Sequence, residues 1–243
     1  MSYLGDQIDP LDPRSKVRPV VRFGAIGEAW ALIRRELGTW VLAMVILLIG
    51  FSGLSLLAEA IFGPGIRLGF RQARPFLSVS RRGAATLVQS IIYIAINGFF
   101  LGGMVRMAAR QIRGQPIKVG DLFSVIDVLP ELLLASFLVA LAMAVGFALC
   151  VLPGFLVGGL LMFVIPLVVD GRLRATEAIR RSWRALEGQW LSATLFHLVA
   201  GLLASSGFLL CGIGILITAP LYAVSVTVLY RDFFSGKFAP STY

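Results

Sequence analysis

The chain has 243 residues, of which 58% are hydrophobic and only 14% are charged, and its mean hydropathy is +0.87. Soluble globular domains contain about 45–50% apolar and about 25% charged residues, so this composition excludes an ordinary water-soluble fold. Lys and Arg outnumber Asp and Glu by 22 to 13, which gives a net charge of +9. These bases lie at the ends of apolar segments, so we expect them to meet anionic membrane lipids and no nucleic acid.

The N-terminal segment is polar, with Pro10, Pro13 and Pro19 placed between alternating charges. We expect residues 1–22 to form a disordered cytoplasmic tail, followed by a membrane domain at 23–233 and a C-terminal tail at 234–243. The N-terminal segment lacks an apolar core and a small-residue cleavage site, so no removable signal peptide is expected.

Long uncharged segments fill the rest of the chain, and about 20 apolar residues in a helix cross a hydrocarbon core of roughly 30 Å. The uncharged stretch 132–169 is too long for one crossing and is expected to turn at Pro153-Gly154 and to kink before Pro166. Glycines at 212 and 214 divide 188–230 in the same way. The pattern predicts an all-α polytopic membrane protein with six transmembrane helices, at about 37–62, 85–105, 132–152, 155–169, 191–210 and 213–230.

Basic residues orient these spans. The segments before the first span, between the second and third, between the fourth and fifth, and after the sixth carry 17 of the 22 Lys and Arg residues. The positive-inside rule therefore places both termini in the cytoplasm. The other five bases lie in segment 66–84, which is either external or held in the interface with its arginines on lipid phosphates.

An amphipathic pattern follows the fourth predicted span. Arg174, Glu177, Arg180, Arg181, Arg184 and Glu187 share one arc of about 140°, and the opposite side carries Ala175, Ala178, Ile179, Ser182, Trp183, Ala185 and Leu186. The segment predicts an interfacial amphipathic helix, or equally a helix across the bundle floor with a solvated charged face. The lipid-headgroup candidates are Arg174, Arg180, Arg181, Arg184, Trp183 and Trp190.

Carboxylates near the span ends are the candidates for transport, because a proton relay needs acidic groups that water can reach. These are Glu59, Asp127 and Glu131. The sole histidine, His197, excludes a multi-histidine metal site, and we expect no catalytic residue, metal, cofactor or enzymatic activity. Cys150 and Cys211 both fall at outer turns, either as a disulfide or as two buried thiols.

Several short motifs carry a resemblance. They are Gly120-Asp121-Leu122-Phe123, Leu152-Pro153-Gly154, the run from Pro166 to Asp170, Glu177-Ala178, Gly188-Gln189-Trp190, Cys211-Gly212-Ile213-Gly214 and Tyr230-Arg231-Asp232. Over about residues 97–232 the chain resembles a broad group of uncharacterised bacterial membrane proteins, similar to the membrane region beside some glycerophosphodiester phosphodiesterase domains. The resemblance implies six helices in a bacterial inner membrane, and it carries over no catalytic residue.

These observations favour a non-enzymatic role. We expect an accessory or scaffold protein of the inner membrane that contacts lipids, and a membrane-protein partner, through its basic interfacial helices. The alternative is a transporter for a small solute or a lipid. The two are distinguished by the effect of neutralising the three carboxylates on uptake, and by the effect of breaking helix 173–187 on partner capture.

Overall fold

The computed structural model describes residues 19–62, 82–209 and 214–234. Every regular element in these ranges is a helix, which confirms the predicted all-α class. The elements are α1 (Gly24–Arg35), α2 (Leu37–Phe62), α3 (Arg82–Ile112), η1 (Val119–Val128), α4 (Leu129–Leu149), α5 (Val151–Leu160), α6 (Val164–Val169), α7 (Ala175–Leu186), η2 (Glu187–Gln189), α8 (Trp190–Ser205), η3 (Ser206–Leu209) and α9 (Ile215–Phe233).

Six segments are long and apolar enough to cross a membrane, as predicted. They are Leu37–Leu54, Ser90–Ile112, Val119–Leu149, Val151–Val169, Ala175–Phe208 and Ile215–Phe233. Large apolar side chains are exposed along several of them, including Leu149 at 77% and Leu202 at 68%. Side chains of this kind need an apolar environment, so the chain is a multi-pass membrane protein whose exterior faces lipid.

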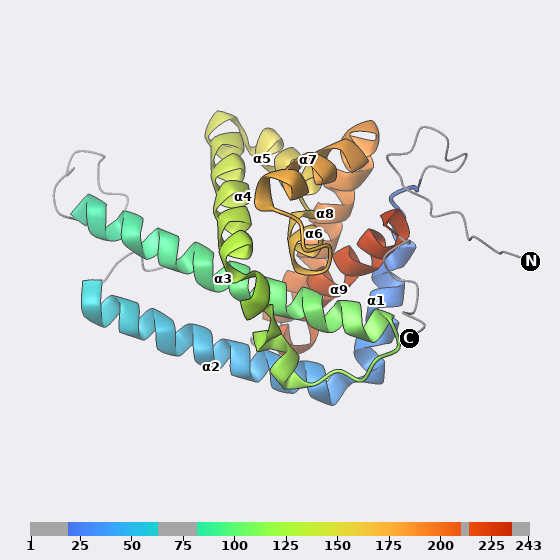
Figure 1. Cartoon of the computed structure of the whole chain (residues 1–243), viewed down its shortest axis with the longest axis horizontal. Helices are drawn as coiled ribbons and strands as arrows, with labels where there is room; N and C mark the ends of the chain where they lie inside the picture. The colour runs from blue at the N-terminus through green and yellow to red at the C-terminus, as the bar shows by residue number, and fades with distance from the viewer. Residues whose placement is uncertain (1–18, 63–81, 210–213, 235–243) are drawn as a thin grey trace, which may run out of the picture.

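Helix α9 forms the centre of the bundle. It packs against α1, α2, α3 and α8, and its residues from Ala223 to Tyr230 are all buried. On the far side of α8, the hairpin of α4 and α5 completes the bundle. Figure 1 shows α2 and α3 side by side, with their ends near residues 62 and 82 pointing away from the other helices.

Stretch 132–169 is broken twice, and only the first break differs in position from the prediction. Helix α4 ends at Leu149, and Pro153 lies inside the first turn of α5, because a helix needs no N–H donor there. The second break, at residues 161–163, divides the fourth span into α5 and α6 and lies before Pro166, where the kink was expected.

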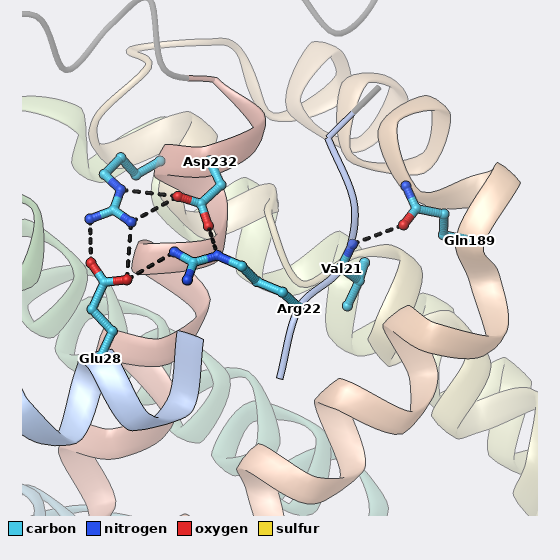
Figure 2. Close-up of polar contacts among 6 residues, drawn as sticks. Val21, Arg22, Glu28, Gln189 and Asp232 are labelled. Atoms are coloured by element: carbon cyan, nitrogen blue, oxygen red, sulfur yellow. Dashed lines mark hydrogen bonds and ion pairs between the residues drawn. The ribbon is translucent and has the colours of Figure 1, made fainter. Parts of the chain in front are cut away.

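The first and last described residues pack on the bundle, although the sequence assigned them to the tails. Gln189 accepts the N–H of Val21 at 2.8 Å (Figure 2). It also donates to the backbone oxygen of Pro19 at 2.8 Å. Residues 19–22 of the predicted tail therefore pack on the bundle, and Phe234 of the predicted C-terminal tail is buried. Residues 1–18 and 235–243, Cys211 and most of segment 66–84 lie outside the described residues.

Candidate functional site

The charged ends of the spans gather on one face of the bundle. Asp127 accepts from Arg106 at 2.8 Å and from Arg172 at 2.7 Å, and so joins α3, η1 and the segment before α7. Asp170, which is almost completely buried, pairs with Arg113. We call this surface the charged face. Its paired residues are Arg22, Glu28, Arg106, Arg110, Arg113, Asp121, Asp127, Asp170, Arg172, Arg231 and Asp232.

These contacts show which span ends share a side. The paired residues come from four places: before the first span, the facing ends of the second and third spans with the segment between them, the segment between the fourth and fifth spans, and the end of the sixth. These four segments are the ones predicted to be cytoplasmic. Segments on one side of a membrane are separated by an even number of spans, and the contacts among these four segments agree with that rule. The contacts do not depend on which compartment the charged face meets.

Four charges join the first and last helices on this face (Figure 2). Glu28 on α1 accepts from Arg231 at 2.5 Å and from Arg22 at 2.8 Å, while Asp232 accepts from Arg22 at 2.6 Å. The hydrogen bonds from Arg231 and then Arg22 hold the pKa of the Glu28 carboxyl below its ordinary value of 4.5. The Glu28 carboxylate therefore stays ionised at neutral pH and holds both arginines.

Two of the three transport candidates have structural partners. Asp127 is the carboxylate that Arg106 and Arg172 share, and Glu131 accepts the backbone N–H of Ala175 at 2.8 Å. That N–H belongs to the first turn of α7, where a helix leaves its donors unsatisfied and favours a negative charge. Glu59 lies in α2, and its side chain is outside the described part of the chain.

Helix α7 packs its apolar face on the break in the fourth span. The buried residues of this face are Ala175, Ala178, Ser182 and Leu186. The hydroxyl of Ser182 donates to the backbone oxygen of Leu160 at 2.7 Å and accepts the N–H of Phe163 at 3.3 Å. It thus serves backbone groups on both sides of a break that water does not reach.

The opposite face of α7 carries the lipid-headgroup candidates. Arg174, Arg180 and Arg184 are exposed, and none of them pairs with a carboxylate among the described residues. Arg181 differs, because it forms an ion pair of 2.7 Å with Glu177 one turn away. Trp190 is half exposed, at the start of α8.

The sequence pattern placed Trp183 on the side of α7 opposite the charged arc, and in the structure it lies at the exposed edge of that side. It is 42% exposed and lines a surface groove of about 360 Å³ together with Ile179, Arg180, Arg184 and Glu187. The reason is geometric, since Trp183 is three residues from Arg180 and adjacent to Arg184, at the edge between the two faces. The groove thus combines two guanidinium groups, one carboxylate and an indole.

Sequence reasoning missed the uncharged polar residues that join the segments of this face. Gln111 accepts from the indole N–H of Trp40 at 3.0 Å and donates to the backbone oxygen of Leu32 at 2.8 Å, so it ties α3 to α1 and α2. Gln189 in turn ties residues 19–21 to the start of α8, through its hydrogen bonds with Pro19 and Val21. Both residues are glutamines at span ends. This position was the one signal in the sequence that could have identified them as contacts between segments.

Comparisons with known proteins give one relevant similarity. No protein-family model matches the chain. No solved structure matches it. The chain is similar to Uncharacterized protein Rv2560 of Mycobacterium tuberculosis (strain ATCC 25618 / H37Rv), with 26% identity over 158 residues that cover 63% of this chain and 48% of the relative. The chain therefore spans about half the length of the curated relative it matches.

Proposed function

We propose that this chain is a non-enzymatic accessory or scaffold protein of a bacterial inner membrane, and that the exposed face of α7 binds anionic lipid headgroups. The observation that carries the proposal is the groove on α7. In it Arg180 and Arg184 flank Trp183, and no carboxylate among the described residues pairs with either guanidinium. Guanidinium groups bind phosphate through paired hydrogen bonds, and an indole ring suits the depth of the headgroups.

The strength of this interaction follows from the number of free arginines. A basic residue near an anionic membrane surface contributes about 1 kcal/mol, so Arg174, Arg180 and Arg184 together supply about 3 kcal/mol. Glu187 at the end of the groove opposes part of this. Loss of Arg180 and Arg184 should therefore weaken binding by roughly tenfold to thirtyfold, at about 1.4 kcal/mol for each factor of ten.

The test is a binding measurement with a charge-matched control. The full chain, purified in mild detergent, is titrated with short-chain phosphatidylglycerol, and the double variant Arg180→Gln/Arg184→Gln is compared with Arg34→Gln/Arg35→Gln. Arg34 and Arg35 are also exposed, and they lie on α1 away from the groove. We expect a tenfold or greater loss for the α7 variant and less than twofold for the control. Equal losses would show attraction by net charge alone and would refute a site on α7.

The orientation proposed for the chain places the charged face in the cytoplasm, with both termini inside. Its support is the bias of Lys and Arg toward the segments that form this face. In intact cells a cysteine at Thr176, an exposed position of α7, should resist an impermeant thiol reagent, while one at Ser206 should react. Cys150 and Cys211 are replaced first. Labelling at position 176 and not at 206 would show that the chain has the opposite orientation.

A transporter is the second candidate, and the break in the fourth span favours it. Discontinuous helices form substrate sites in several transporter folds. In this chain the break is filled, because Phe163 is fully buried and Ser182 serves the backbone on both sides. Transport would be supported by lost uptake or efflux in Asp127→Asn or Glu131→Gln at unchanged protein level.

A further inference from the structure

A second surface groove is lined by α2, α3 and η1. Figure 1 shows that α2 and α3 project from the rest of the bundle. Its volume is about 570 Å³, within the range of about 300–1,000 Å³ that small-molecule sites occupy. Among the described residues, those that line it are all apolar or glycine: Gly50, Gly53, Leu54 and Leu57 of α2, Ala95, Ile96, Phe99 and Phe100 of α3, and Phe123 of η1.

The groove ends under η1. Gly103 of α3 allows η1 to approach closely, since a methyl group at this position would lie 2.5 Å from the backbone oxygen of Leu122. The next residue of η1, Phe123, then packs on Phe99 with ring centroids 6.1 Å apart. The apolar groove therefore begins beneath η1 and runs along α2 and α3.

The end beneath η1 is positively charged. Arg106 follows Phe99 by seven residues, so both lie on one face of α3, about 10 Å apart along the helix. Arg106 and Arg172 share the single carboxylate of Asp127, so this carboxylate neutralises one of the two guanidinium charges beside η1. The side chain of Arg172 is 67% exposed, and it can contact a headgroup without losing Asp127.

The size of the groove and the charge at its end decide between a lipid chain and a helix as its occupant. A helix with its side chains is about 10–12 Å wide and rises 5.4 Å per turn, so one turn fills roughly 400–600 Å³. The groove therefore has the volume of about one helical turn. A flexible acyl chain can occupy an apolar surface groove of this volume and leave its headgroup at the charged end, and this charge favours an anionic phospholipid over an uncharged partner helix.

We propose that the groove between α2 and α3 binds one acyl chain of an anionic phospholipid, whose phosphate lies beside Arg172 under the roof of η1. This site is separate from the α7 groove and does not depend on it. The α7 surface meets headgroups alone, whereas this site needs both the apolar groove and the charge at its end. Neutral diacylglycerol should therefore bind here more weakly than phosphatidylglycerol.

Gly53 offers a way to fill the groove without disturbing its walls, since a methyl group there meets no atom within 4 Å. Gly201 in the middle of α8 is equally open and lies outside the groove, so Gly201→Phe is the matched control for Gly53→Phe. The full chain is purified in mild detergent, supplied with phosphatidylglycerol and examined by native mass spectrometry. We expect Gly53→Phe to lose at least fivefold in bound lipid, and Gly201→Phe to behave as the wild type.

Other outcomes locate the headgroup or overturn the proposal. Arg172→Gln should reduce retention of phosphatidylglycerol and leave that of diacylglycerol unchanged, whereas equal losses of both would place the headgroup elsewhere. Unchanged lipid retention in Gly53→Phe would overturn the proposal, as would loss of a dimer in place of a lipid, which would make a second copy of the chain the occupant.

A measurement on the unaltered chain guards against misfolding of the variant. Phosphatidylglycerol with a photoreactive acyl chain should label peptides that contain residues 50–57, 95–100 or 123. The labelling should persist in Arg180→Gln/Arg184→Gln, which separates this site from the α7 groove. Labelling confined to α4 or α8 would refute the proposal.

Discussion

The serine at the helix break offers the sharpest test of how the fourth span is held. In a continuous helix the N–H of Val164 would reach the oxygen of Leu160, but here it donates to Leu161 at 3.0 Å. The hydroxyl of Ser182 takes its place at Leu160, and it also accepts the N–H of Phe163. Since Ser182 is fully buried, Ser182→Ala leaves these two groups without a replacement from water.

The expected loss can be estimated from these contacts. A buried acceptor left without its partner costs about 1–3 kcal/mol, and the longer bond from Phe163 contributes less. Side-chain hydrogen bonds between membrane helices average about 0.6 kcal/mol with a maximum of about 1.7, which sets the lower part of the range. We expect about 2 kcal/mol, or a fall of about 4–8 °C in unfolding temperature for a chain of this size.

The assay is thermal unfolding in mild detergent, with Ser206→Ala as the control. Ser206 also donates to a backbone oxygen, that of Leu203 at 2.7 Å, but it is exposed at the end of α8. Its removal should change the free energy of unfolding by less than about 0.5 kcal/mol. If Ser182→Ala unfolds within about 1 °C of the wild type, the break does not depend on this hydroxyl and the reasoning is refuted.

Three other predictions follow from the packing and the charges. Because the pKa of Glu28 is held below 4.5, its contacts stabilise the fold above that pH and are lost as the pH falls below it. The unfolding temperature of Glu28→Gln should therefore depend less on pH between 7 and 3 than that of the wild type. Gly103→Ala brings a methyl group within 2.5 Å of a backbone oxygen and should destabilise the chain by more than about 1 kcal/mol, whereas Gly201→Ala, which meets no atom within 4 Å, should be neutral or stabilising in the same assay. Gln111→Leu removes two hydrogen bonds between helices and should lower the unfolding temperature, with a blue shift in tryptophan emission if Trp40 loses its polar partner.

The resemblance to membrane regions beside phosphodiesterase domains stays an expectation. The similarity to the mycobacterial protein concerns 63% of this chain and carries no named activity. The lipid contacts proposed above therefore rest on the geometry of two grooves, one formed by charged and aromatic side chains on α7 and one formed by apolar side chains between α2 and α3.

The sequence by itself determined the class of protein and the number of apolar segments. Hydrocarbon thickness sets the length of a span, so the uncharged runs of the chain are sufficient to count the crossings. The amphipathic period of α7 was likewise visible, because helix geometry assigns residues to faces without knowledge of their neighbours. The position of the break between the third and fourth spans was not determined by the sequence, since Pro153 is compatible both with a turn and with the first turn of a helix.

Only the tertiary structure decided which polar groups meet. Arg231 pairs with Glu28 across 203 residues, and Arg113 pairs with Asp170 across 57, while the burial of Ser182 depends on where α5 breaks. No local pattern encodes such pairs, because they follow from the packing of whole helices. The same holds for the groove between α2 and α3, whose walls are ordinary lipid-facing residues until the two helices and η1 are brought together.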